Sequence, residues 1–238
     1  MSTLSQGDST VDISDEIEET IDTTSIFIDG IDVVQTDAAE ILLTSQEGTS
    51  LRTETTGSTL LTGQPLQGTA ENPASISLVT DGTRAVSEAQ VVAINTSTVS
   101  NTVITTAESV DGSTVAAAEI LVSSDNVEAV SIKTASTQQK SQVRFDGTTE
   151  RLAGVRIEME GAGGNLEVQS ASVENLQVKA AGDQFSEITF GTEVETVANA
   201  QIEIGQSGGS LEMEGGTLAS STIAISSDRS AVNSVNIS

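Results

Sequence analysis

Short runs of β-branched and other aliphatic residues, each only three to five residues long, recur along most of the chain. They include 26–28, 76–79, 91–94, 155–159 and 223–225. Several runs alternate apolar and polar residues with period two, which is typical of β-strands. The chain has four Phe and no Trp or Tyr. The pattern therefore predicts an all-β fold whose core is built from Val, Ile, Leu and Ala.

Pairs of turn-forming residues separate these runs. Asp-Gly and Gly-Gly pairs supply the positive φ angles that tight hairpin turns require. We therefore expect sequence neighbours to be joined by hairpins and to pair antiparallel. The pairs are Asp-Gly at 29–30, 81–82, 111–112 and 146–147, and Gly-Gly at 163–164 and 208–209.

An internal repeat points in the same direction. The segment 156–168 aligns without a gap with 201–213, and each copy reads as strand, Gly-Gly turn, strand. A weaker repeat pairs 39–45 with 118–124. The distances between copies are unequal, which argues against a solenoid of fixed rung length and favours recurring hairpins. The sequence thus predicts an antiparallel jelly roll or β-sandwich, as one large barrel or two stacked β-barrels.

Charge separates an N-terminal arm from the rest of the chain. The first 40 residues carry eleven acids and no base. We assign residues 1–24 to a short acidic arm and 25–238 to the β-rich region. A boundary between two barrels is expected near 135–154. The arm is either a solvated tail or an element that docks on a neighbouring subunit.

The candidate assembly residues come from two segments of opposite character. In the arm, isoleucines recur every four residues, which predicts one or two helical turns with an apolar side. A later segment holds five of the nine basic residues. These cations either form ion pairs on their own surface or provide a landing site for the arm of an adjacent copy. The residues are Ile13, Ile17, Ile21, Lys133, Lys140, Arg144, Arg151 and Arg156.

The net charge of −26 on 24.4 kDa indicates a protein suited to very salty water. In dilute buffer the carboxylates repel one another, and the unfolded chain relieves that repulsion. The Debye length falls from about 10 Å at 0.1 M salt to about 3 Å at 1 M, so concentrated salt removes most of this cost. Only three of the nine basic residues are lysines. The alternative is an ordinary acidic mesophilic protein, which normally carries more lysine.

Composition also excludes several functions. The chain has no His and no Cys, so the usual catalytic triads and zinc sites are not available. Carboxylates near turns are plentiful, but no stretch matches a complete calcium loop. We expect no enzyme activity and no cofactor or bound metal. The negative charge disfavours nucleic acid as a partner. No apolar run reaches the ~20 residues of a transmembrane helix, and no signal peptide is recognisable, so synthesis in the cytoplasm is expected.

A cofactor-free, Ser/Thr-rich β protein with a halophilic composition resembles the capsid proteins of haloarchaeal viruses, specifically the vertical single jelly-roll type. The resemblance covers length, composition and strand count. It implies a self-assembling shell subunit of the virion, made in the host cytoplasm, which forms homo-oligomers and contacts itself and other virion proteins. Two other classes remain open. One is a turret, spike or fibre protein of a tailed haloarchaeal virus, and the other is a surface adhesin or filament subunit.

Overall fold

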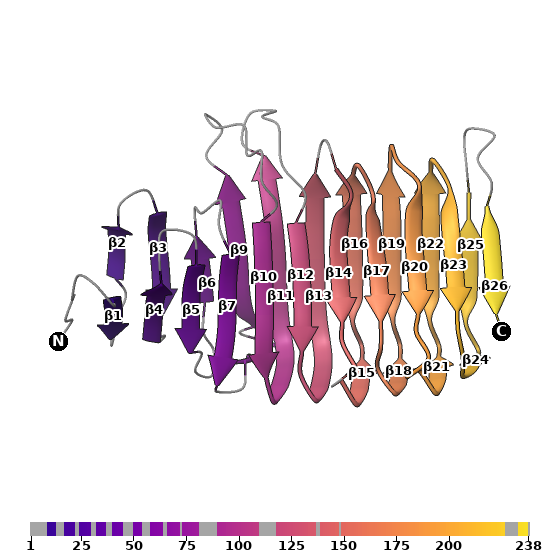
Figure 1. Ribbon diagram of the computed structural model, residues 1–238, viewed down its shortest axis with the longest axis horizontal. Coiled ribbons are helices and arrows are strands. Elements are labelled where there is room, and N and C mark those ends of the chain that lie inside the picture. The colour runs from indigo at the N-terminus through magenta and orange to yellow at the C-terminus, as the bar shows by residue number, and fades with distance from the viewer. Residues whose placement is uncertain are drawn as a thin grey trace.

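Within the described part of the chain, the computed structural model consists of strands and turns. The described residues are 9–12, 17–21, 24–29, 32–36, 40–44, 50–53, 58–63, 66–71, 73–80, 90–109, 118–136, 139–147, 149–226 and 233–237. The strands stand side by side along the long axis of the molecule, and their order in space follows the sequence from the N-terminal to the C-terminal end (Figure 1).

The strands form two sheets. Sheet A contains, in spatial order, β1 (Ser9–Asp12), β4 (Asp32–Thr36), β5 (Glu40–Thr44), β7 (Ser58–Gly63), β10 (Gln90–Thr96), β12 (Ala118–Ser123), β14 (Ser141–Phe145), β17 (Gly164–Val168), β20 (Ser186–Phe190), β23 (Gly209–Met213) and β26 (Ser234–Ile237). Sheet B contains β2 (Ile17–Ile21), β3 (Thr24–Asp29), β6 (Ser50–Thr53), β9 (Ala74–Thr80), β11 (Thr98–Ser109), β13 (Asn126–Ser136), β15 (Arg151–Ala153), β18 (Ser172–Glu174), β21 (Thr196–Ala198) and β24 (Thr217–Ala219). Also in sheet B are β8 (Leu66–Gln67), β16 (Arg156–Gly161), β19 (Gln177–Gly182), β22 (Gln201–Gln206) and β25 (Thr222–Ile225).

The chain winds between the two sheets as a β-solenoid. Each rung has a strand in sheet A, a turn, one long strand or two short ones in sheet B, and a second turn. From the β5–β7 and β6–β9 pairs onward the described ladders are parallel. Parallel neighbours need a crossover of a dozen or more residues, and here the strand in the opposite sheet provides it. Only the four pairs nearest the N-terminal end, β1–β4, β2–β3, β3–β6 and β4–β5, are antiparallel among the described ladders.

The core lies between the sheets and is made of stacked columns of like residues. One column contains Val122, Phe145, Val168, Phe190 and Met213, which are in register and buried. Each β-strand turns alternate side chains to opposite faces, so the period-two pattern of β14 is buried, exposed, buried, exposed, buried. The expected aliphatic core is confirmed for the described residues, with Val, Ile, Leu and Ala as its main members.

The predicted antiparallel jelly roll or β-sandwich, with one or two stacked barrels, is wrong. The described turn pairs do not close hairpins. Gly163-Gly164 joins β16 to β17, Gly208-Gly209 joins β22 to β23, and Asp146-Gly147 joins β14 to β15. In each case the turn carries the chain from one sheet to the other, so a strand pairs with the previous rung and not with its sequence neighbour. The other Asp-Gly pairs lie wholly or partly outside the described residues.

Strand pairing continues across the segment that was expected to separate two barrels. In sheet A, β12 pairs with β14 and β14 pairs with β17. In sheet B, β13 pairs with both β15 and β16. The described strands between 135 and 154 therefore belong to ladders that extend in both directions.

The expected helical turn in the N-terminal arm is also wrong. Ile17 and Ile21 are the first and last residues of β2, which pairs antiparallel with β3 of the same chain. Ile13 lies outside the described residues. The spacing of four residues between Ile17 and Ile21 is an even number, so it fits the period of two of a strand as well as the period of 3.6 of a helix.

The internal repeat is explained by a two-rung period. Arg156 is in register with Gln177, and Gln177 with Gln201, so the two aligned segments are separated by one intervening rung. Turns of five and three residues between sheet A and sheet B alternate along the stack, at 146–150, 169–171, 191–195 and 214–216. Alternating turn lengths make neighbouring rungs unequal and every second rung alike. The unequal spacing therefore does not argue against a solenoid.

This two-rung period predicts a stabilising substitution. The Thr149 side chain is buried, and its Oγ1 has no hydrogen-bond partner among the described residues. Val194 occupies the same place two rungs later, in a turn with the same backbone hydrogen bond: Thr149 N donates to Asp146 O at 3.0 Å, and Val194 N donates to Gly191 O at 3.1 Å. We expect Thr149→Val to raise the free energy of unfolding by about 1 kcal/mol, because it removes a buried, unpaired hydroxyl.

The reciprocal substitution Val194→Thr is the matched control, and it should lower the free energy of unfolding by a similar amount. Denaturant titration in molar KCl measures both values. A Thr149→Val protein that is less stable than the wild type would show that the hydroxyl has a partner.

Candidate functional site

The outward face of sheet B carries a ladder of alternating charge. Lys133, Glu158, Lys179 and Glu203 are in register on β13, β16, β19 and β22. Successive members stand on neighbouring strands, which lie about 4.8 Å apart in a sheet. Each lysine in the middle of the stack therefore has a carboxylate on at least one adjoining rung. We call these four residues the charge ladder.

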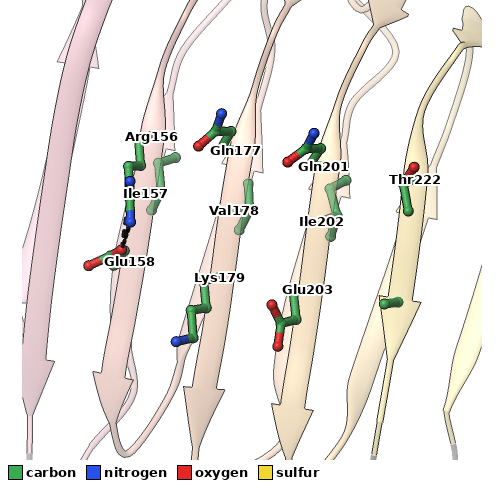
Figure 2. Close-up of a pocket in the computed structure, with 11 residues that line it drawn as sticks. Arg156, Ile157, Glu158, Gln177, Val178, Lys179, Gln201, Ile202, Glu203 and Thr222 are labelled. Carbon is green, nitrogen blue, oxygen red and sulfur yellow. Dashed lines mark hydrogen bonds and ion pairs between the residues drawn. The ribbon is translucent and has the colours of Figure 1, made fainter.

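A second column of polar residues runs beside the charge ladder. It contains Arg156, Gln177, Gln201 and Thr222, again in register. Arg156 Nε donates a hydrogen bond to Glu158 Oε1 at 3.1 Å, and its Nη2 also bonds to the same oxygen. Figure 2 shows this column beside three members of the charge ladder, Glu158, Lys179 and Glu203, with the Arg156–Glu158 pair at one end. Over four neighbouring strands the second column thus presents a guanidinium, two amides and a hydroxyl in turn.

Between the two columns lies a shallow depression of about 370 Å³. Its polar lining is Arg156, Glu158, Gln177, Lys179, Gln201, Glu203 and Thr222. The depression is open to solvent along the face. Its walls offer both donors and acceptors, but the described part of the chain has no group of three or more acidic residues that could hold a metal ion.

The electrostatics of the ladder act most strongly on Glu158. The hydrogen bonds from Arg156 lower the pKa of the Glu158 carboxyl below its ordinary value of 4.5. Partial burial opposes this effect, and the positive charges of Arg156, Lys133 and Lys179 reinforce it. A lowered pKa means that the folded state prefers the ionised carboxylate.

A pH dependence follows from this shift. The contribution of Glu158 to stability is fully present above its unfolded-state pKa and is lost as the pH falls through the lower folded-state pKa. We expect Glu158→Gln to be less stable than the wild type at pH 7, by less than about 1 kcal/mol because the partners are mostly exposed. The difference should shrink as the pH falls below 4.5, because the folded-state pKa is lowered from that value.

Parallel denaturant titrations of the two proteins at several pH values test this expectation. Glu203→Gln serves as the control, since Glu203 ends the ladder and has no arginine hydrogen bond among the described contacts. A Glu158→Gln deficit that is the same at pH 3 and pH 7 would show that the carboxylate charge is not responsible.

The outward face of sheet A has a comparable but more acidic arrangement. A depression of about 360 Å³ is lined by Glu119, Gln142, Arg144, Asn165, Glu167, Glu187, Thr189, Ser210 and Glu212, with Val143 and Leu166. Arg144 Nε lies 3.5 Å from Glu167 Oε2 on the next strand. The two broad faces therefore share one construction, in which polar columns run along the stack.

The five basic residues singled out from the sequence are not gathered into one patch. Arg144 lies on sheet A, Lys133 and Arg156 lie on sheet B, Arg151 starts the short strand β15, and Lys140 precedes β14. Each pairs with a glutamate of its own chain. The pairs are Lys133–Glu160 (3.6 Å), Lys140–Glu187 (2.9 Å), Arg144–Glu167 (3.5 Å), Arg151–Glu128 (3.7 Å), Arg151–Glu174 (3.3 Å) and Arg156–Glu158.

These contacts agree with the local ion-pair alternative. Arg151, for example, stands between two acids, since Glu128 belongs to the preceding rung and Glu174 to the following one. Docking of the N-terminal arm on this segment of a neighbouring copy stays a prediction. Within the chain, the described strands of the arm pair with β3 and β4.

The charge ladder was not found from the sequence. Its members are separated by 25, 21 and 24 residues, and no local motif connects them. The signal that could have found it is the 45-residue repeat of 156–168 in 201–213, because that distance spans two rungs.

Comparison with protein-family models, with curated proteins and with solved structures gave no match. Among the described residues, no helix is long and apolar enough to cross a membrane. The absence of enzyme activity and of a cofactor stays a prediction.

Proposed function

We propose that this chain is a non-enzymatic structural protein that forms the rigid shaft of a spike or fibre on a virion adapted to concentrated salt. The observation that carries the proposal is the stacking of rungs along one axis, with continuous parallel ladders in both sheets. In such a stack each rung contacts only its neighbours, so the protein extends in one direction. An extended, stiff element suits a projection better than it suits a closed shell.

The surface supports the same proposal. Both broad faces carry polar and charged columns, so they favour contact with water and ions over lateral burial against identical neighbours. Obligate shell contacts are usually large and apolar. Among the residues whose side-chain burial the structure describes, the exposed large hydrophobic ones are Val235 and Ile237, and both belong to β26 at the C-terminal end of the stack.

The shell-subunit function expected from the sequence depended on an antiparallel jelly roll. Since the fold is a solenoid, the spike or fibre alternative now has the better structural basis. The step from solenoid to shaft rests on the shape of the fold.

Labelling of native particles tests the proposal. Antibody raised against residues 118–226 should decorate projections that stand away from the particle surface, as seen by electron microscopy in molar salt. Label spread evenly over a closed shell would overturn the shaft function. Label confined to the surface of cells would assign the rod to an adhesin or filament instead, and would equally overturn the virion proposal.

A further inference from the structure

The C-terminal end of the rod leaves an apolar cross-section exposed. β26 pairs with β23 on one side, and its other edge has no partner among the described strands. Val235 is in register with Leu211, and Ile237 with Met213. Leu211 and Met213 are 1% and 0% exposed, whereas Val235 and Ile237 are each 51% exposed. The two residues thus continue core columns that nothing in the described structure covers.

Sheet B ends at the same cross-section. Its last strands are β24 and β25, and each pairs on one side only among the described strands. Leu218, Ile223 and Ile225 pack against the core but are only partly buried. Both layers of the rod therefore finish together in an open edge with unpaired backbone groups, and such edges readily pair with another strand.

This end differs from the rest of the molecule in charge. Residues 215–238 contain one acid, Asp228, and one base, Arg229, so they are neutral in a chain of net charge −26. The first 40 residues, by contrast, carry eleven acids and no base. Two copies that meet through their neutral C-terminal ends bring few carboxylates together. Contact through the acidic parts of the chain would instead be opposed by repulsion between carboxylates.

We propose that this end joins a second copy of the chain across a two-fold axis, with β26 pairing antiparallel with its counterpart. Asn236 then lies opposite the partner's Asn236, and Val235 lies opposite the partner's Ile237. In this register both apolar residues stay on the core side, because side chains alternate along a strand. The axis stands perpendicular to the sheets, so sheet A meets sheet A and sheet B meets sheet B. The inference does not depend on the proposed function.

A head-to-tail arrangement is disfavoured by the same charges. It would place the neutral apolar edge against the acidic N-terminal strands and would bury carboxylates without compensating cations. A two-fold contact is self-complementary and closes after two copies. The expected product is therefore a discrete dimer with a rod about twice as long as one copy.

Sedimentation in molar KCl provides the first test. The wild type should have twice the mass of the 24.4 kDa chain. Val235→Lys combined with Ile237→Lys should raise the dissociation constant by about 100-fold or more, since two buried aliphatic side chains are lost from each copy. The control is Gln142→Lys combined with Gln177→Lys, which adds the same charges at exposed outward positions and should leave the dimer intact.

Cross-linking tests the symmetry. The chain has no cysteine, so Asn236→Cys places a single thiol at the proposed axis. Under oxidation it should give a disulfide-linked dimer, whereas Ser210→Cys on the preceding strand β23 should not. This cross-linking test also shows whether the two-fold contact forms if the Val235→Lys, Ile237→Lys protein does not fold. A wild type that stays monomeric, an open polymer series, or a dimer without the Asn236→Cys cross-link would each overturn the proposal.

Discussion

Lowering the salt from molar concentrations to about 0.1 M is expected to unfold the N-terminal rungs before the C-terminal ones. Residues 1–117 carry eighteen acids and only two bases, Arg52 and Arg84, whereas residues 118–214 carry sixteen acids and six bases. As the Debye length grows, repulsion between carboxylates returns. It should act first where the acids have the fewest cations near them.

Strand register gives the physical reason in more detail. In the ladders from β12 to β26, no acidic residue lies directly opposite another. Acids there face amides, hydroxyls, alanine or a basic residue. At the other end, Asp12 of β1 lies opposite Asp32 of β4. Like charges opposite each other in a sheet are destabilising, and the salt that screens them is therefore most needed at this end.

Hydrogen exchange measured at decreasing KCl concentrations tests this expectation. Amides of β1 to β7 should lose protection first, by about 100-fold or more in exchange rate, and circular dichroism should lose part of its β signal at the same stage. The rungs from β12 to β25 should remain protected to lower salt, because each rung depends mainly on its neighbours. Sodium should replace potassium without effect, since screening does not distinguish them. Protection that stays unchanged along the whole chain would reject the halophilic interpretation.

The all-β character could be predicted from the sequence, but the direction of strand pairing could not. β14 and β16 show the alternation that the sequence displays, with Phe145 and Ile157 among their buried positions. An antiparallel strand and a solenoid strand with one buried face produce the same alternation. The turns did not resolve this ambiguity, because Gly163-Gly164 can close a hairpin or carry the chain into the opposite sheet.

The candidate site was hidden for a related reason. Lys133 and Arg156 are close in the sequence to Arg144, yet the coil places Arg144 on the opposite face of the rod. Conversely, Lys133 and Glu158 are far apart in the sequence but in register on neighbouring strands. In a solenoid, charged residues that are neighbours in the sequence therefore lie on different faces. Charged residues that form a column on one face come from different rungs and are distant in the sequence. The length of a rung relates the sequence to the columns. The repeat at 45 residues spans two rungs, so it gives the length of a pair of rungs and not of a single one.

The strongest single-residue test of the stack is expected at Gly209, where a side chain has no room. Gly209 is buried in β23 and pairs with Ser186 of β20. A Cβ atom at Gly209 would lie 2.3 Å from the Ser186 backbone oxygen and 2.7 Å from Ile204 Cγ2. The backbone oxygen belongs to the ladder between two rungs, so it cannot move without disturbing the pairing.

Gly209→Ala should therefore lower the free energy of unfolding by about 3 kcal/mol or more, at the upper end of what overpacking costs. Gly164→Ala, at the equivalent place two rungs earlier, should cost less. The Cβ atom there would meet the Met159 side chain, with Sδ at 2.3 Å and Cβ at 2.9 Å. A methionine side chain adapts more easily than a backbone oxygen of the ladder.

Gly205→Ala is the matched control for Gly209→Ala. It makes the same chemical change on β22, the strand that precedes β23 along the chain. A Cβ atom there would meet nothing closer than Ser226 Oγ at 3.7 Å. Denaturant unfolding in molar KCl should rank the variants as Gly205→Ala, Gly164→Ala and Gly209→Ala in order of increasing loss. If Gly209→Ala is as stable as Gly205→Ala, strands β20 and β23 cannot be paired in this register. The parallel stack, from which the charge ladder and the apolar end both follow, would then be wrong at this rung.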